Sequence, residues 1–401
     1  MIFKGWEQME LIDSLILVPP QDAAFNIELL SCTVFDHLAS AAAAFSPQRV
    51  FSRGLCAGKS DFASCLAADD LASLVDAYLL ASSAPSVLLL LQPAPALSPQ
   101  TFNALAQLAE SQTGSAVLRD GDEVLAVLLP RESLEAYDFG DFTGLSALRL
   151  CEDLNAVAHD VPPAERHVVA DTVSAYFAQE ALRARINYFW MEQGVMLTDP
   201  NTTYISPLAR IGEGSVILPG CFLNGRTQVG EGCRIGPNAF LQDAEIGSRV
   251  SVNSSQIYES SVGDETTVGP FAYIRPGSSV GKKARIGDFV ELKKARVGDG
   301  TKVAHLTYLG DVTLGERVNV GCGVVTVNYD GKNKYHTTVG DDSFIGCNVN
   351  LVSPVKVGRG AYLAAGTTVT EEVPEDSMCI GRVRATVKPG WAKKRRDSGK
   401  L

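Results

Sequence analysis

The sequence predicts two structural classes in one chain, an α/β domain followed by a parallel β-helix. Only eight of the 36 glycines lie in residues 1–200, and the other 28 lie in residues 201–401. The first part alternates short apolar runs with helical patterns, whereas in the second part aliphatic residues recur every six positions. Glycine is poor in helix interiors and useful at repeated tight turns, so the shift in glycine content marks a change of architecture.

In the first part, short apolar runs predict strands and longer amphipathic patterns predict helices. The expected strands are Ser14–Val18, Arg49–Ser52, Ser86–Leu91, Ser115–Arg119 and Glu123–Leu129. The expected helices are Glu28–Ala44, Asp70–Ala81, Pro99–Glu110 and Leu145–Leu154. This alternation is typical of a parallel sheet with helices on its faces. A pattern from Glu165 to about Gln193 then predicts a connecting helix that ends at Gly194.

The second part carries a six-residue repeat of aliphatic side chains. The repeat includes Ile211, Ile217, Leu223, Val229, Ile235, Leu241, Val262, Val268, Ile274, Val280, Ile286, Val339, Ile345, Leu351, Val357, Leu363 and Val369. A period of six fits neither a helix nor an alternating hairpin, but it is the hexapeptide signature of a β-helix. An ordinary antiparallel domain would need hairpin turns every 8–12 residues or so. Between Thr326 and Val339 the repeat breaks, and we expect one loop expelled from the coils, which is usually functional.

Composition limits the classes of function. Hydrophobic residues make up 46% and charged residues 20%, as in an ordinary soluble globular chain. The net charge of −11 disfavours nucleic acid as a partner, because phosphates would be repelled. The apolar runs are far shorter than the roughly 20 residues of a membrane span, and the first residues lack a signal-peptide pattern. Nine cysteines without a CxxC pair fit neither a disulfide framework nor a zinc site. We expect a cytoplasmic protein with no membrane partner.

A basic stretch lies within this acidic chain. Residues 270–339 hold eleven Lys and Arg against six Asp and Glu. Such a stretch suits an anionic substrate such as a sugar phosphate or CoA, although a solvated surface is the usual role of lysines. Arg275 lies between the stacked Ile274 and Pro276, so its guanidinium can meet phosphate oxygens as a bidentate fork.

Only two histidines, His305 and His336, lie in the second part of the chain. A histidine suits the deprotonation of a sugar amine, because it changes charge close to neutral pH. A lone histidine is nevertheless more often structural than catalytic.

Five motifs occur in sequence within the second part. They are GPFAYIRPG (269–277), IGDFVELKKARVG (286–298), HLTYLGD (305–311), VNVGCG (318–323) and VNYDGKNK (327–334). Through these motifs the chain from Arg185 onward resembles the acetyltransferase half of the bacterial bifunctional N-acetylglucosamine-1-phosphate uridyltransferase/glucosamine-1-phosphate N-acetyltransferase family. The resemblance implies a left-handed parallel β-helix that assembles as a homotrimer, with acetyl-CoA bound where neighbouring subunits meet.

The same resemblance assigns the site residues one by one. His305 matches the family's catalytic base. The positions that match substrate-binding residues are Arg275, Lys293, Tyr308, Asn319 and Lys334. The positions that match the acetyl-CoA site are Cys322, Asn328, Tyr329, Cys347, Ala365 and Arg382. Cys322 stands where the family usually has alanine and Cys347 where it usually has serine, which puts the affinity for the cofactor in question.

The first part resembles the uridyltransferase half only faintly, as a degenerate nucleotidyltransferase-like domain, a Rossmann-like sandwich. The family's glycine-rich basic phosphate loop is replaced by LILVPPQDAAFN (15–26), which contains no glycine, lysine or arginine. After the strand Val87–Leu91, where the family has a Gly-Asp that holds magnesium, this chain has Gln92-Pro93-Ala94-Pro95. We expect uridyltransferase activity to be lost.

These features predict an enzyme that acetylates the amine of glucosamine 1-phosphate from acetyl-CoA, without a metal, in the biosynthesis of UDP-N-acetylglucosamine. The alternatives are an N-acetyltransferase for another amino sugar phosphate and a non-catalytic trimeric scaffold. A zinc carbonic anhydrase on this fold would need three histidine ligands, and the β-helix has two histidines. The expected domains are 1–163 (nucleotidyltransferase-like), 164–196 (connecting helix), 197–385 (β-helix) and 386–401 (basic tail).

Overall fold

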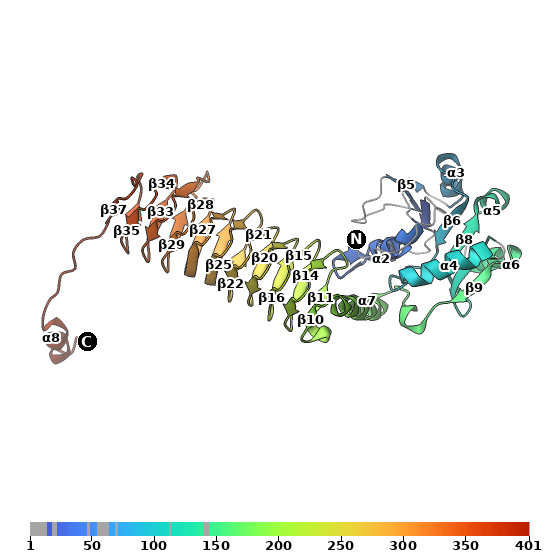
Figure 1. The fold of residues 1–401 in the computed structure, drawn as a ribbon, viewed down its shortest axis with the longest axis horizontal. Coiled ribbons are helices and arrows are strands. Elements are labelled where there is room, and N and C mark those ends of the chain that lie inside the picture. Colours follow the sequence, from blue (N-terminus) through green and yellow to red (C-terminus); the bar gives the residue numbers. More distant parts are fainter. Residues whose placement is uncertain are drawn as a thin grey trace. The chain divides into compact units, whose positions relative to one another are not determined.

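The computed structural model describes residues 14–17, 22–45, 49–53, 64–68, 71–111, 114–139 and 144–400. The chain divides into two compact units. The first unit comprises Met1–Ala209 with Phe222–Arg226, and the second comprises Arg210–Cys221 with Thr227–Leu401. Figure 1 shows an α/β fold in the first unit and stacked coils of short strands in the second. Both predicted fold classes are therefore confirmed.

The first unit is built on a seven-stranded sheet with the order β5-β4-β1-β6-β8-β7-β9. Its strands are β1 (Ser14–Leu17), β4 (Arg49–Arg53), β5 (Ser64–Ala68), β6 (Ser86–Leu90), β7 (Ala116–Asp120), β8 (Glu123–Pro130) and β9 (Val157–Asp160). The pairs β1–β4, β1–β6 and β4–β5 are parallel, as expected, but β8 runs antiparallel to both β6 and β7. The prediction of a purely parallel sheet is wrong here, because only Gly121 and Asp122 connect β7 to β8. A parallel pair needs a crossover of about a dozen residues or more.

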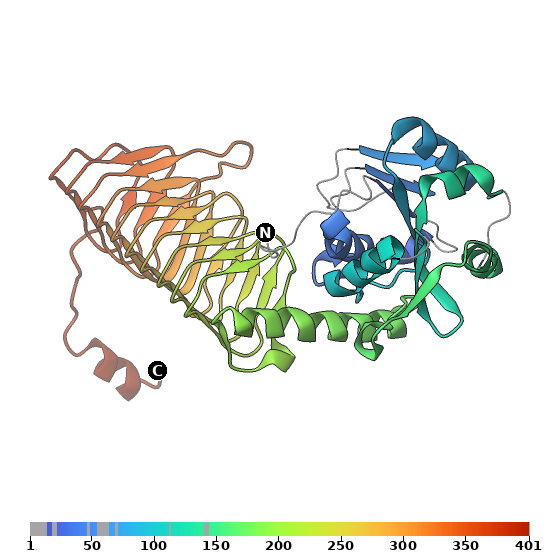
Figure 2. The same ribbon diagram turned by 45° about the vertical axis from the view of Figure 1, so that its right-hand side comes forward.

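Helices cover both faces of this sheet, which makes the first unit a three-layer sandwich (Figure 2). Leu88 and Leu90 of β6 enter one core with α1 (Asp22–Phe25), α2 (Val34–Ala41), α4 (Pro99–Ser111) and α7 (Thr172–Glu192). Val87 and Leu89 enter the opposite core with α3 (Leu71–Ala81), α5 (Arg131–Ala136) and α6 (Gly144–Asp153). The two-residue period of a strand explains why successive apolar residues of β6 serve opposite cores.

Two helices begin later than the sequence predicts. Helix α2 begins at Val34 rather than Glu28, because residues 28–33 form the hairpin of β2 (Glu28–Leu29) and β3 (Cys32–Thr33). The Thr33 hydroxyl accepts the Asp36 N–H at 3.0 Å and the Asp36 carboxylate accepts the Thr33 N–H at 2.9 Å, a capping box that fixes this start. Helix α7 begins at Thr172 rather than Glu165, after a similar box formed by Asp171 and Ser174.

The second unit is a parallel β-helix, and every aliphatic residue of the predicted repeat is buried. One face is a nine-stranded sheet of β12 (Arg210–Ile211), β15 (Gln228–Val229), β18 (Glu245–Ile246), β21 (Ser261–Val262), β24 (Ser279–Val280), β26 (Arg296–Val297), β28 (Val312–Leu314), β31 (Thr337–Val339) and β34 (Val355–Val357). In this face Leu314 stacks directly on Val339. The coil between them is longer because it contains the expelled loop, residues 328–336 (Figure 2).

The remaining faces merge into one sheet, because β25 and β27 each pair with two strands of the neighbouring coil. Its strands are β10 (Met196–Leu197), β11 (Tyr204–Ile205), β13 (Val216–Ile217), β14 (Phe222–Asn224), β16 (Arg234–Ile235), β17 (Phe240–Gln242), β19 (Ser251–Val252), β20 (Gln256–Tyr258), β22 (Thr267–Val268), β23 (Tyr273–Ile274), β25 (Arg285–Lys293), β27 (Lys302–Gly310), β29 (Asn319–Val320), β30 (Val325–Val327), β32 (Phe344–Ile345), β33 (Asn350–Val352), β35 (Tyr362–Leu363), β36 (Thr368–Val369) and β37 (Met378–Cys379). In most coils a corner interrupts two short strands, but β25 and β27 continue through it.

The basic tail carries α8 (Trp391–Asp397), in which the Arg395 guanidinium lies 5.0 Å from the centre of the Trp391 ring. Among the described helices, none has the length and apolar character required to cross a membrane.

Candidate active site

The long strands β25 and β27 bring the candidate base beside a carboxylate. They pair in parallel with Asp288 opposite His305. Nδ1 of His305 lies 2.5 Å from Oδ1 of Asp288, and about half of the His305 side chain is exposed. A neutral imidazole that donates Nδ1–H to this carboxylate keeps its lone pair on Nε2. Nε2 is then the atom that can accept a proton from a substrate.

Asp288 is a site residue that the sequence analysis missed. The hydrogen bond from His305 holds the pKa of Asp288 below its ordinary value, so the carboxylate stays charged and fixes the ring. The signal was present in the sequence, since Asp288 lies 17 positions before His305, which is one coil of the β-helix. Nothing in the local pattern marks that spacing as chemical rather than structural.

The backbone beside this pair is strained. Phe289 and Leu306, which follow Asp288 and His305, have φ of 54° and 44°. A bulky residue in this left-handed region costs about 1–3 kcal/mol and persists only where the surrounding structure holds it. The same left-handed conformation occurs at this corner in the preceding coil, at Phe271, so it belongs to the β-helix as a whole and not to the site alone.

Two lysines converge beside a carboxylate at the end of β25. Nζ of Lys293 lies 3.5 Å from Oδ2 of Asp311, and the Asn328 amide donates to the same oxygen. A hydrogen bond between the amines of Lys293 and Lys334 raises the pKa of Lys293, and together with the charge of Lys293 it lowers the pKa of Lys334. Only Lys293 pairs with Asp311, so two lysines beside one carboxylate leave positive charge available to an anionic ligand.

Arg275 adds a third cation on the neighbouring coil. Its N–H donates to the Leu292 carbonyl at 2.9 Å, which places Arg275 next to Lys293 in the sheet. Nη1 lies 3.0 Å from Oε1 of Glu291, and the hydrogen bond to Glu291 raises the pKa of the guanidinium. The guanidinium also lies 5.9 Å from the centre of the Tyr273 ring. Glu291 and Tyr273 thus hold the fork of Arg275 beside the lysines.

Gly310 leaves the space in which the candidate substrate contact Tyr308 and the candidate acetyl-CoA contact Asn328 meet. A Cβ on Gly310 would lie 2.5 Å from the Tyr308 hydroxyl oxygen and 2.9 Å from Nδ2 of Asn328. The sequence analysis did not single out Gly310, although a glycine inside a strand often marks the close approach of another group. Asn319 lies on β29, opposite Lys302 and Phe344, on the strand that leads into the His305 corner.

The expelled loop folds on itself and returns Lys334 to the coil. Tyr329 and Lys334 form an antiparallel bridge, and the Tyr329 hydroxyl donates to the Gly331 carbonyl at 2.6 Å. Oδ1 of Asp330 accepts the N–H groups of Lys332 and Asn333, which lowers the pKa of Asp330. Tyr329 therefore lies at the base of the loop, one residue from the buried Asn328.

Four of the six predicted cofactor positions form a column along one corner of the β-helix, whereas Asn328 and Tyr329 lie at the expelled loop. Cys322, Cys347, Ala365 and Arg382 occupy successive coils: the Cys322 carbonyl accepts the Asn348 N–H, the Cys347 carbonyl accepts the Gly366 N–H, and the Ala365 carbonyl accepts Nε–H of Arg382 at 2.9 Å. The Gly323 N–H donates to the Leu306 carbonyl at 3.1 Å, so the same corner continues back to His305. The thiol of Cys347 is exposed and that of Cys322 is partly exposed.

In the first unit, the strand order reverses between β1 and β6. Parallel neighbours flank β1 on both sides, and open α/β sheets bind ligands where the order reverses, beyond the carboxyl ends of the strands. After β6, residues 93–98 are buried, and the Pro93 carbonyl accepts the Val169 N–H at 2.9 Å. This segment contains no charged residue. In the stretch 15–26, residues 18–21 lie outside the described part of the chain.

Comparison with known proteins identifies a matching family model and relatives of this chain. The family model "Bacterial transferase hexapeptide (six repeats)" matches residues 209–243 and 336–371. The chain is similar to proteins named "Bifunctional protein GlmU". The one from Halalkalibacterium halodurans is 48% identical over 229 residues, which are 57% of this chain and 50% of the relative. The one from Thermoanaerobacter pseudethanolicus is 47% identical over 264 residues, which are 65% of this chain and 58% of the relative.

The chain thus spans between half and three-fifths of the length of these curated relatives. Among solved structures, 2-C-methyl-D-erythritol 4-phosphate cytidylyltransferase from Thermus thermophilus aligns with 43% of this chain and 100% of that chain. The sequence identity is 14% and the TM-score is 0.30, a likeness that carries no inference about function.

Proposed function

We propose that this chain, which belongs to the GlmU family, transfers an acetyl group from acetyl-CoA to the amine of glucosamine 1-phosphate. The observation that carries the proposal is a histidine with its partner carboxylate on the same two strands as Lys293, with Arg275 from the neighbouring coil and Lys334 from the expelled loop. His305 and Asp288 supply a base, and Arg275, Lys293 and Lys334 supply a site for a phosphate. An amino sugar phosphate is the acceptor that needs both.

The chemistry follows from the free Nε2 of His305. A sugar amine resembles an α-amino group, whose reference pKa is about 8, so near neutral pH much of it is protonated and cannot attack. Nε2 accepts a proton from the amine while the amine nitrogen bonds to the thioester carbonyl carbon. The C–S bond then breaks, and the proton on Nε2 passes to the leaving CoA thiolate. Asp288 stabilises the imidazolium that exists between these steps.

The other proposed contacts hold the two substrates. Arg275 and Lys293, with Lys334 from the expelled loop, bind the phosphate, and Tyr308 with Asn319 contacts the sugar. Asn328 and Tyr329 lie where the acceptor and the acetyl-CoA arm meet. The arm follows the corner column of Cys322, Cys347, Ala365 and Arg382. Positioning supplies much of the rate enhancement, because a neutral amine held against a thioester reacts in an effectively unimolecular step; we propose no metal in this half-reaction.

A homotrimer is part of the proposal. Phe271, Phe289 and Leu306 are exposed at the corner that carries Asp288 and His305, and the rings of Phe271 and Phe289 stack with centroids 5.4 Å apart. Exposed contiguous apolar side chains favour a protein partner. A neighbouring subunit that covers this corner would enclose the acetyl-CoA column, which is open on a single chain.

The experiment that tests the acceptor measures CoA thiol release from acetyl-CoA. Glucosamine 1-phosphate, glucosamine and glucosamine 6-phosphate are compared at equal concentration. The proposal expects the highest kcat/KM with glucosamine 1-phosphate and the lowest with glucosamine, because only a phosphorylated sugar contacts the three cations. A higher kcat/KM for glucosamine 6-phosphate would show that the acceptor is another amino sugar phosphate. No turnover of any acceptor would favour the alternative of a non-catalytic trimeric scaffold.

A further inference from the structure

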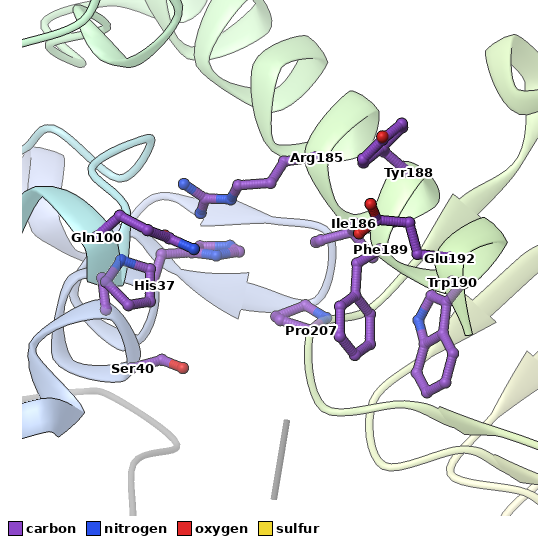
Figure 3. Close-up of a pocket in the computed structure, with 12 residues that line it drawn as sticks. His37, Ser40, Gln100, Arg185, Ile186, Tyr188, Phe189, Trp190, Glu192 and Pro207 are labelled. Carbon is purple, nitrogen blue, oxygen red and sulfur yellow. The ribbon is translucent and has the colours of Figure 1, made fainter. Parts of the chain in front are cut away.

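A second cavity lies far along the sequence from the residues above. It has a volume of about 300 Å³, and all of its lining residues belong to the first unit. Helix α2 contributes His37 and Ser40, the start of α4 contributes Gln100, and α7 contributes Arg185 together with aromatic side chains (Figure 3). Its volume is at the lower end of the range for small-molecule sites, which are roughly 300–1,000 Å³.

The cavity contains a cation that lacks an anion. Nη1 of Arg185 donates to the carbonyls of Ala96 and Leu97 at 2.7 and 3.3 Å. In the described part of the chain, Arg185 forms no ion pair, and no hydrogen bond to its Nε or Nη2 is found. Burial lowers the pKa of this guanidinium. A desolvated charge is normally paired, so two free N–H groups beside an apolar wall indicate a missing oxyanion.

Within the described ranges, the nearby acidic side chains form no ion pair with Arg185, although the charge of Glu165 acts to raise the pKa of Arg185 against the effect of burial. Oε2 of Glu165 already accepts from the Ser98 N–H at 2.8 Å and the Thr101 hydroxyl at 2.7 Å, at the start of α4. Glu192 also lines the cavity, but it is exposed two turns of α7 beyond Arg185, about 10 Å along the helix axis.

The other residues that line the cavity determine which part of a ligand can pack beside Arg185. Phe189, Trp190, Ile186 and Pro207 line the cavity, and Figure 3 shows the Arg185 guanidinium reaching from α7 toward Gln100 and His37. Nε2 of His37 lies 2.9 Å from the Leu29 carbonyl, and burial lowers the pKa of His37 to about 4, so the ring is neutral at pH 7. The cavity therefore offers one cationic end and a largely apolar, aromatic remainder.

We propose that this cavity binds a small organic acid, in which a carboxylate or phosphate group pairs with Arg185 and a flat apolar body packs against Phe189 and Trp190. The site is distinct from the proposed acetyltransferase site and does not depend on it. Carboxylate and phosphate share the oxyanion that the free Nε–H and Nη2–H groups can receive as a fork.

The test is isothermal titration calorimetry of the full chain with benzoate, phenyl phosphate and the uncharged benzyl alcohol. We expect one or both acids to bind at least tenfold more tightly than the alcohol, and their ratio distinguishes carboxylate from phosphate. Arg185→Gln should weaken binding of the preferred acid at least tenfold. Arg149→Gln, which removes an exposed arginine of α6, should leave it unchanged.

A second variant gives a test that does not depend on the folding of Arg185→Gln. This test is needed because the guanidinium of Arg185 also donates to two backbone carbonyls. Ser40→Phe keeps Arg185 and adds a ring at the cavity wall, so it should abolish binding of the acid. Three results would overturn the proposal. They are an equal affinity for benzyl alcohol, unchanged binding of the acid in folded Arg185→Gln or Ser40→Phe, and no binding of either acid up to about 10 mM, a Kd that is too weak for a specific site.

Discussion

His305 and Asp288 show how two successive coils of a β-helix can assemble a base and its partner. Their backbones pair in register, and a 2.5 Å contact between Nδ1 and Oδ1 fixes which ring nitrogen faces the substrate. An ordinary surface histidine has no such partner. The charge on Asp288 also favours the imidazolium that forms when Nε2 takes the proton.

Asp288→Asn tests this positioning role. The amide keeps the size of the side chain but removes the negative charge, so kcat should fall at least tenfold and less than the roughly 10²–10⁴-fold expected for loss of the base itself. KM for the sugar phosphate should change little, because the three cations are untouched. Asp153→Asn, on the exposed surface of α6, serves as the control; an unchanged kcat in Asp288→Asn would contradict the role.

Cys347→Ser restores the serine that the family usually has at this position of the cofactor column. A hydroxyl is a better hydrogen-bond partner than a thiol, and one such bond contributes roughly 0.5–1.5 kcal/mol net. We expect KM for acetyl-CoA to fall by up to about tenfold, measured at saturating acceptor. Cys347→Ala, which supplies no hydroxyl, should not lower it. If the serine variant has the same or a higher KM, the thiol is accommodated by the site.

At the scale of elements, the continuous strands β25 and β27 set the site apart from the other coils. Regular coils need only the buried aliphatic column, whereas this pair continues as strand through the corner and presents Asp288 and His305 in register. Gly310, at the end of β27, provides the space beside Tyr308 and Asn328.

Gly310→Ala distinguishes an effect on the geometry of the site, measured as KM, from an effect on stability, measured as Tm. The added methyl clashes with side-chain atoms of Tyr308 and Asn328, which can move, so KM for glucosamine 1-phosphate should rise about tenfold or more while Tm falls modestly. Gly298→Ala is the matched control, because its Cβ would lie 2.4 Å from the backbone oxygen of Gly315, away from the site. Overpacking against backbone typically costs about 1–3 kcal/mol, so this control should lower Tm more and leave KM unchanged. The opposite ranking, with KM raised only in Gly298→Ala, would refute the assignment.

The sequence was sufficient for features that repeat and insufficient for features that depend on partners far apart in the chain. The six-residue period identified the buried column of the β-helix, from Ile211 to Val369, because each aliphatic residue meets its equivalent one coil away. The strand β8 was predicted but its antiparallel direction was missed, although Gly121 and Asp122 allow only a hairpin; the edge strands β5 and β9 carried too little pattern to be recognised. The partner of His305 was missed because a carboxylate 17 residues away has no local signature.

At the scale of the whole molecule, each unit has its own architecture and core. The first unit keeps an α/β sandwich with hydrophobic cores on both faces of the sheet, yet the segment after β6, where a nucleotide phosphate or its metal would be held, is buried and uncharged. The second unit carries every proposed acetyl-transfer residue. All of the residues proposed for acetyl transfer are therefore separate in sequence from the α/β sandwich.

We predict that the chain has no uridyltransferase activity. Phosphoryl-transfer catalysis depends on positioned cations and a carboxylate-held metal, and residues 92–95 contain no carboxylate. The measurement is pyrophosphate release from UTP and N-acetylglucosamine 1-phosphate with added magnesium. Release in proportion to the amount of purified protein would show that the first unit has kept the activity by other residues.

The most direct test of the central claim is the formation of N-acetylglucosamine 1-phosphate from acetyl-CoA and glucosamine 1-phosphate, followed by mass spectrometry in wild type, His305→Ala and His336→Ala. We predict product with wild type and a kcat lower by about 10²–10⁴-fold in His305→Ala, with little change in either KM. His336→Ala, which removes the other histidine of the β-helix, whose Nε2 bonds the Thr313 hydroxyl at 2.9 Å, should keep most of the activity. No product with wild type, or more than a tenth of wild-type kcat in His305→Ala, would contradict the account.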